Sequence, residues 1–155
     1  MGSSSKDLSN RRKLALIIGN DNYSGEINKL NQSTKNANDL ANLLSKIKFQ
    51  VKTKTDISKG ILEQTQDMIN EFAIQDGDLI LFYFSGHACQ YNGKNYLIPT
   101  DDTRIADVGD VEDTGTDVKK ILDRLMNKGQ SCVVIFILDC CKPYVPKNAS
   151  TSKCK

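Results

Sequence analysis

The stretch of sequence that decides the fold is residues 79–87, which read Leu79-Ile80-Leu81-Phe82-Tyr83-Phe84-Ser85-Gly86-His87. Its first six residues are apolar without interruption, which is typical of a strand that is buried on both faces of a parallel sheet. The change to a small polar residue, a glycine and a histidine indicates that the strand ends there. In open parallel sheets, functional groups collect at the carboxyl ends of the strands. The sequence therefore predicts a polar site directly after this strand.

Two further apolar runs, residues 14–18 and 132–138, have the length of strands and are rich in β-branched residues. Residues 49–53 alternate as a half-exposed strand does. Apolar side chains recur every three or four residues elsewhere, which predicts helices over 33–48, 58–72 and 116–126. Strands that alternate with helices imply right-handed crossovers. We therefore predict one α/β domain of three layers, with a mostly parallel sheet and helices on both faces.

The connecting segments carry signals of their own. Residues 91–97 predict a small hairpin with Asn92-Gly93 at its tip, because this pair adopts the positive φ angles of tight hairpin turns. Residues 99–117 are rich in Asp, Gly and Thr and predict a solvent-facing acidic loop. Ser58 and Thr116 are placed to cap the helices that follow them.

Composition narrows the class of protein. With 155 residues, 39% of them hydrophobic and 26% charged, the chain has the size and composition of one packed globular domain. The formal net charge of +2 is small and its lysines are scattered, which argues against a nucleic-acid partner. No apolar run is long enough for a transmembrane helix. Five cysteines without regular spacing argue against a disulfide framework, so we expect a cytoplasmic location.

Two of the predicted strand ends carry residues that could catalyse a reaction. His87, the one histidine in the chain, follows the strand over 79–84, and Cys140-Cys141 follow the strand over 132–138. A thiolate is a strong nucleophile, and an imidazole can stabilise it and later pass its proton to a leaving amine. This pair is typical of cysteine peptidases. A metal site built from His87, Cys89, Cys140 and Cys141 fits no zinc pattern well, and we do not favour it.

Four ordered segments resemble the paracaspases and metacaspases, the caspase-like cysteine peptidases of clan CD, family C14. Residues 85–88 (Ser-Gly-His-Ala) are similar to the S-G-H-G segment of that family, and residues 137–142 (Ile-Leu-Asp-Cys-Cys-Lys) to its I-L-D-x-C-R segment. Residues 15–23 and 95–102 extend the similarity, which covers most of residues 12–144. The resemblance implies the three-layer caspase-hemoglobinase fold.

The resemblance also implies roles for individual residues. Its register makes Cys141 the nucleophile and places Cys140 at a variable position, with His87 as acid and base. The backbone N–H groups of Ala88 and Cys141 would form the oxyanion hole. Asp139, with Asn36 on the first helix, would line the pocket that selects Arg or Lys before the scissile bond. The expected activity is that of a cysteine endopeptidase acting on protein or peptide substrates.

Three positions depart from the family pattern. Ala88 stands where glycine is usual and tolerates a positive φ less well. Asn36 is an uncharged amide where the family has a second acidic residue. Lys142 stands where an arginine is usual, and it lacks the planar guanidinium group of arginine. These departures leave an alternative function open: a weakly active or inactive caspase-like module that works as a protein-interaction scaffold.

The domain organisation follows from the same resemblance. We expect a flexible N-terminal tail over 1–11, the large-subunit (p20) domain over 12–144, and a polar tail or intersubunit linker over 145–155. The sheet then lacks the strands of the small (p10-like) subunit, so that segment is an expected partner and a homodimer is a further candidate. We expect no cofactor and no membrane contact. The acidic residues of the loop after residue 99 are interpreted as solvated surface, and a calcium site is the less favoured interpretation. These residues are Asp101, Asp102, Asp107, Asp110, Glu112 and Asp113.

Overall fold

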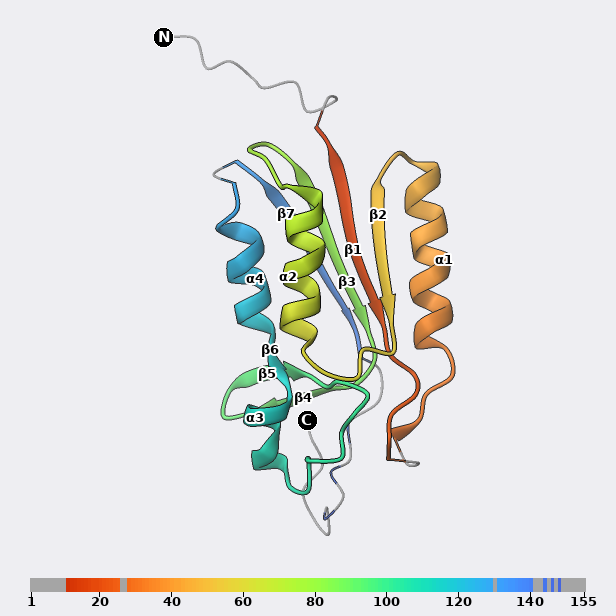
Figure 1. Cartoon of the computed structure of the whole chain (residues 1–155), viewed down its shortest axis with the longest axis vertical. Helices are drawn as coiled ribbons and strands as arrows, with labels where there is room; N and C mark the ends of the chain where they lie inside the picture. Colours follow the sequence, from red (N-terminus) through yellow and green to blue (C-terminus); the bar gives the residue numbers. More distant parts are fainter. Residues whose placement is uncertain are drawn as a thin grey trace.

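The computed structural model describes residues 11–25, 28–129 and 131–140, together with Tyr144, Pro146 and Asn148. Four parallel strands form the main sheet in the order β2-β1-β3-β7 (Figure 1). Their bounds are Lys13–Gly19 for β1, Gln50–Thr55 for β2, Leu79–Ser85 for β3 and Val133–Asp139 for β7. The apolar runs predict β1, β3 and β7, and the alternating stretch predicts β2.

Helices cover both faces of this sheet. Helix α1 (Ser33–Lys46) lies on one face, where it contacts β1, β2 and β3. Helices α2 (Ile61–Phe72) and α4 (Val118–Met126) lie side by side on the other face (Figure 1). The three-layer α/β prediction is confirmed.

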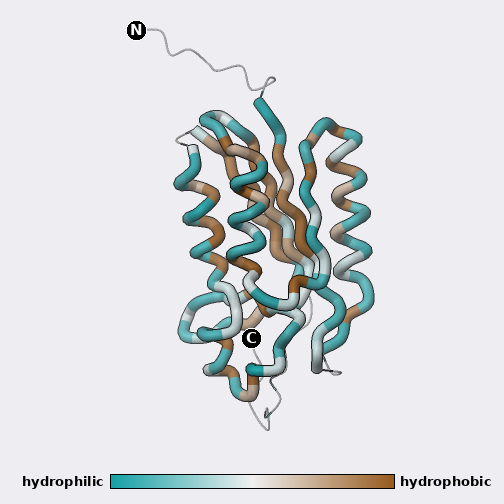
Figure 2. The backbone as a smooth tube through the Cα atoms, viewed as in Figure 1, coloured by the Kyte–Doolittle hydropathy of each residue, from teal (hydrophilic) through white to brown (hydrophobic). Residues whose placement is uncertain are grey.

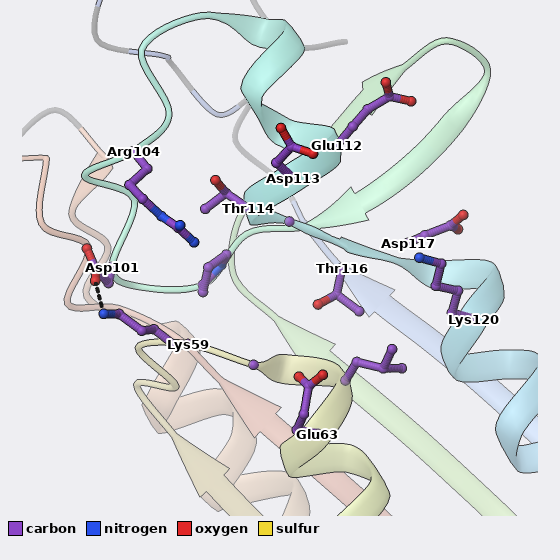
Figure 3. Close-up of a pocket in the computed structure, with 14 residues that line it drawn as sticks. Lys59, Glu63, Asp101, Arg104, Glu112, Asp113, Thr114, Thr116, Asp117 and Lys120 are labelled. Carbon is purple, nitrogen blue, oxygen red and sulfur yellow. Dashed lines mark ion pairs between the residues drawn. The ribbon is translucent and has the colours of Figure 1, made fainter.

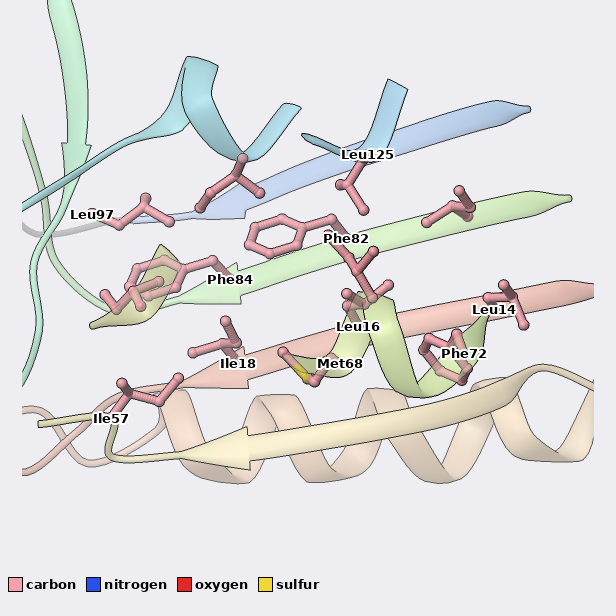
Figure 4. Packing of buried hydrophobic residues seen from close by; sticks show 14 residues of the cluster. Leu14, Leu16, Ile18, Ile57, Met68, Phe72, Phe82, Phe84, Leu97 and Leu125 are labelled. Carbon is pink, nitrogen blue, oxygen red and sulfur yellow. The ribbon is translucent and has the colours of Figure 1, made fainter. Parts of the chain in front are cut away.

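The alternation of side chains along the strands divides the core into two halves. Even-numbered residues of β1 and β3, such as Leu16 and Phe82, pack against α2 and α4 (Figure 4). Odd-numbered residues such as Ile17 and Tyr83 pack against α1. Successive side chains of a strand point to opposite faces, so a continuously apolar strand is what a sheet covered on both sides requires. Figure 2 shows the hydrophobic positions concentrated along these central strands.

A second, antiparallel sheet lies beyond the carboxyl ends of the main strands and consists of β4 (Ala88–Tyr91), β5 (Lys94–Leu97) and β6 (Thr116–Asp117). Strands β4 and β5 form the predicted hairpin, and Asn92 and Gly93 at its tip have φ angles of 48° and 73°. A third hydrophobic cluster fills the space beneath this sheet; its members are Tyr23, Cys89, Tyr96, Ile98, Ile105, Val111 and Tyr144.

Two sequence predictions about the connecting segments are wrong. Residues 99–117 are not simply a solvated loop: they contain the short helices η3 (Val108–Asp110) and α3 (Val111–Thr114), and Ile105 and Asp102 are buried. The helix caps also differ from those predicted. Helix α2 begins after Gly60, which has a left-handed conformation, and α4 is capped by Asp117, whose side chain accepts from the backbone N–H of Lys119. Local propensity does not distinguish neighbouring candidates for a cap.

Strand β7 is an edge of the main sheet and is exposed on one face. Val133, Ile135 and Ile137 are 46%, 40% and 39% exposed, whereas Val134 and Phe136 on the opposite face pack against the core of α2 and α4. Within the parts of the chain that the structure describes, no helix has the length and hydrophobicity needed to cross a membrane.

Candidate active site

The register of the sheet brings the two predicted strand ends together. Ser85 at the end of β3 pairs with Asp139 at the end of β7, and Gly19 at the end of β1 pairs with Ser85 from the other side. His87 follows Ser85 after a single glycine, and Cys141 follows Asp139 after a single cysteine. Parallel strands end at a common edge of the sheet. The segments that follow β3 and β7 therefore begin next to each other at that edge.

Gly86 lets the chain turn sharply between Ser85 and His87. A Cβ atom at this position would lie 2.7 Å from the hydroxyl of Tyr23 and 2.9 Å from the ring of Phe84. Real Cβ atoms do not approach other atoms this closely. A side chain here would push the histidine segment away from Tyr23, so glycine is required by close packing.

The imidazole of His87 is held from two sides and is only 2% exposed. The backbone N–H of His87 donates to the hydroxyl of Tyr23 at 2.8 Å. The Tyr23 ring packs edge-on against the imidazole, with ring centroids 4.6 Å apart. The Tyr23 hydroxyl in turn donates to the carbonyl oxygen of Ile98 at 3.3 Å. Burial raises the pKa of Tyr23 well above its usual range, so this hydroxyl stays protonated and keeps its role as a donor.

The backbone carbonyl of Asn28 determines the tautomer of His87. The Nε2 atom of His87 lies 2.7 Å from the carbonyl oxygen of Asn28. A carbonyl oxygen can only accept, so Nε2 carries the proton and a neutral ring has its lone pair on Nδ1. This is the form that a general base needs. Sequence reasoning misses Asn28 because its contribution is a main-chain atom, which no residue type signals.

The two residues that the resemblance assigns to the specificity pocket lie together. The side-chain amide of Asn36, on α1, lies 3.5 Å from the Oδ2 atom of Asp139. Both border a cavity of about 180 Å³, which is also lined by Leu30, Asn31, Gln32, Ser33, Ser85 and Gly86. The cavity therefore lies between the start of α1 and the ends of β3 and β7, next to the turn that carries His87.

Two hydroxyl groups that the sequence analysis does not identify also contact the Asp139 carboxylate. Tyr83 donates to Oδ2 at 3.0 Å and Ser85 at 3.4 Å. Burial, aided by the neighbouring Asp139 charge, raises the pKa of Tyr83 to about 12, so it donates throughout the neutral range. The alternation of β3 is the signal that could have revealed them, because residues 83 and 85 lie on the α1 face of the strand.

Close packing and a buried carboxylate bring α1 to the pocket. A Cβ at Gly19 would lie 2.5 Å from the carbonyl oxygen of Ser33, so only glycine lets the first turn of α1 approach β1. Asp21 accepts from the backbone N–H groups of Ser33 at 2.8 Å and Thr34 at 3.0 Å. Burial alone would raise the pKa of Asp21, yet the hydrogen bonds from Thr34 and Ser33 lower it below its ordinary value. A carboxylate at a helix N-terminus also stabilises the helix dipole.

The cysteines differ in their surroundings. Cys140 is partly buried, is not in a disulfide, and packs against the core of α2 and α4, as does Cys132. Cys141 lies outside the described residues. Cys89 is buried in the cluster beneath the small sheet and is disulfide-bonded. Because catalysis by a cysteine requires the thiolate, measurements on this chain should include a reductant.

Ala88, the second residue assigned to the oxyanion hole, begins β4 and pairs with Leu97. Its φ angle is not positive. The exchange of glycine for alanine at this position therefore causes no backbone strain.

A larger hollow of about 290 Å³ lies apart from this site, between the start of α2, the segment after β5 and the start of α4 (Figure 3). Charged side chains of both signs surround it, and Lys59 and Asp101 form an ion pair across 3.3 Å. Neither His87 nor Asp139 lines it. In the described part of the chain, no three His, Cys, Asp or Glu side chains are grouped so that they could hold a metal ion.

Comparison with known proteins agrees with this fold. A solved structure of protein GSU0716 from Geobacter sulfurreducens superimposes with a TM-score of 0.61 at 20% sequence identity, covering 84% of this chain and 50% of that one. The chain thus spans about half the length of that protein, and the likeness shows the fold. Among curated proteins, none matches the chain. The sequence profile of the caspase domain, Peptidase_C14, matches residues 12–154. This chain therefore belongs to the caspase-domain family of peptidases.

Proposed function

We propose that the chain is the large-subunit part of a cysteine endopeptidase of the paracaspase or metacaspase type, which hydrolyses peptide bonds after Arg or Lys. The observation that carries this proposal is the buried His87 with its proton on Nε2, beside a pocket that holds the carboxylate of Asp139. The histidine supplies the acid and base, and the carboxylate supplies the selectivity.

The reaction begins when the thiol of Cys141 transfers its proton to Nδ1 of His87. The thiolate attacks the scissile carbonyl carbon, and the negative charge that develops on the oxygen is stabilised by the N–H groups of Ala88 and Cys141. The imidazolium then donates its proton to the leaving amine as the C–N bond breaks. Water, deprotonated by the same histidine, hydrolyses the thioester and releases the acid product.

Selectivity for a basic side chain would come from one negative charge in a small pocket. Asp139 accepts hydrogen bonds from the neutral donors of Tyr83, Ser85 and Asn36. A guanidinium or ammonium group that enters the cavity gains a charge-assisted hydrogen bond, whereas an acidic side chain is repelled. The amide of Asn36 adds polarity without a second charge.

The proposed partner is a small-subunit segment, supplied by the same or another chain, that pairs with β7. The apolar exposed face of β7 supports this proposal, as does the finding that the chain spans half of a protein of the same fold. An edge strand with unpaired N–H and C=O groups is a template for a further strand. Pairing of β7 with a second copy of the chain is the alternative. The cytoplasm would keep Cys141 reduced.

Active-site labelling tests the proposal. The reduced chain, with and without a small-subunit segment, is treated with a peptide acyloxymethyl ketone that ends in arginine, and the modified residue is identified by mass spectrometry. We expect labelling of Cys141 that is lost in Cys141→Ala and retained in Cys140→Ala. An aspartyl ketone serves as the control for selectivity. No labelling of Cys141 under either condition would indicate the scaffold function instead.

A further inference from the structure

Four buried groups form a continuous hydrogen-bonded path that begins at His87. Nε2 of His87 donates to the Asn28 carbonyl at 2.7 Å, and the side-chain amide of Asn28 donates to Oδ2 of Asp102 at 3.2 Å. The hydroxyl of Tyr144 donates to the same Oδ2 atom at 2.9 Å. All four residues are almost completely buried. Tyr144 closely follows Cys141 in the sequence, so the path joins the histidine to the segment after the nucleophile.

Asp102 is the group on which the path converges. Its side chain accepts from three donors: the backbone N–H of Gly25 at 3.1 Å, the amide of Asn28 and the hydroxyl of Tyr144. The residue is 1% exposed. A buried carboxylate is costly unless several donors satisfy it, and here all three come from segments distant in the sequence. One side chain thus ties Gly25 and Asn28 to Tyr144.

We propose that Asp102 is a positioning residue for the catalytic histidine, acting through Asn28, and that Tyr144 couples this support to the nucleophile segment. The inference rests on the proposed function for its role in catalysis. Asn28 takes part through both its main-chain oxygen and its side chain, so a shift of the amide toward or away from Asp102 moves the carbonyl that orients His87.

An aromatic contact supports the same coupling. The ring of Tyr144 packs edge-on against the imidazole of His87, with centroids 5.8 Å apart. Burial first, and then the neighbouring Asp102, raise the pKa of Tyr144 above its usual range, so its hydroxyl remains a donor. Tyr144 therefore reaches the histidine by ring packing and by the path through Asp102.

His87 is the one histidine in the sequence, so its imidazole can be observed directly by NMR in protein labelled with ¹⁵N-histidine. In the reduced wild-type chain we expect the tautomer with the proton on Nε2 and slow exchange of that proton. Asp102→Asn replaces one of the two acceptor oxygens by an NH2 donor, so the side chain can no longer satisfy all three donors. We expect it to shift the tautomer ratio toward Nδ1–H by roughly fivefold, the effect of one net hydrogen bond, and to speed the exchange. Tyr144→Phe removes one donor and should shift the ratio less.

Asp101→Asn is the matched control, because it makes the same change at the neighbouring, more exposed carboxylate, which contacts Lys59 and Thr103 instead. It should leave the imidazole signal unchanged. Thermal unfolding identifies any variant that does not fold, and Tyr144→Phe then carries the test. Unchanged tautomer ratio and exchange in folded Asp102→Asn and Tyr144→Phe would overturn the proposal.

Activity measurements separate this inference from the proposed function. In cleavage of an arginyl peptide with the small-subunit segment present, Asp102→Asn should lower kcat roughly tenfold with little change in KM, because substrate contacts are untouched. If the wild-type chain cleaves nothing but its imidazole responds to Asp102→Asn as expected, the function is wrong and the positioning role stands. A rise in KM alone would contradict the positioning role.

Discussion

The two halves of the site are built differently. On the histidine side, His87, Tyr23, Asn28 and Asp102 are all buried and joined by hydrogen bonds of 2.7–3.2 Å. On the pocket side, Asp139 is only half-buried, and its hydrogen bonds with Ser85 and Asn36 are 3.4 and 3.5 Å long. The difference suggests that the reaction machinery is rigid and sensitive to any change, whereas the selectivity can be altered by single substitutions.

The largest effect is expected on the histidine side. Cys141→Ala and His87→Ala should each lower kcat/KM by about 10³-fold or more, because each removes a group that forms or breaks a bond. Cys140→Ala should retain most activity, since that thiol packs against the core. Cleavage of an arginyl fluorogenic peptide by the reduced variants measures this. Greater loss in Cys140→Ala than in Cys141→Ala would show that the register of the nucleophile is wrong.

The second-largest effect is expected on the pocket side, and it distinguishes selectivity from the reaction itself. Asp139→Asn should lower kcat/KM for an arginyl peptide by about 10- to 100-fold, because a hydrogen bond to a charged group contributes about 1.5–3 kcal/mol. The rate of labelling of Cys141 by a small neutral alkylating agent should hardly change, since it does not use the pocket. An equal loss in both measurements would mean that Asp139 supports the reaction itself.

Packing on the histidine side can be broken without touching a catalytic group. Gly86→Ala places a Cβ against Tyr23 and Phe84, and we expect it to destabilise the fold by about 1–3 kcal/mol and to reduce activity. Urea unfolding measures the change in stability. Gly77→Ala is the control for backbone strain, because φ is positive at both glycines but no atom lies within 4 Å of the Cβ position at Gly77. Equal stability of the two variants would contradict the close approach.

The smallest effect is expected for Asn36→Asp. It adds a second negative charge beside Asp139 and should increase the preference for arginyl over aspartyl peptides by a few fold, because exposed charges interact weakly. Competition between the two peptides in one assay measures the ratio. If the preference is unchanged, Asn36 does not contribute to recognition. Asn38→Asp, at an exposed position of the same helix, controls for the added charge.

The sequence alone determined the strands of the main sheet, the helices α1, α2 and α4 that cover it, and the place of the candidate site. Uninterrupted apolar runs can be satisfied only in a sheet covered on both faces, and strands that alternate with helices run parallel, so His87 and Asp139 had to reach the same edge. The resemblance to a family added roles for Cys141, Ala88 and Asn36, and the structure places Asn36 beside Asp139. The histidine and the pocket were therefore within reach of sequence reasoning.

The tertiary structure alone decided how these groups are held. The proton of His87 is on Nε2 because a main-chain carbonyl of Asn28 faces it, and a carbonyl leaves no trace in residue type. Asp102 belongs to a segment that reads as solvated loop, yet it is buried because donors from Gly25, Asn28 and Tyr144 converge on it. Composition records how polar a segment is, but burial depends on which distant segments meet it, and only the folded chain brings those partners together.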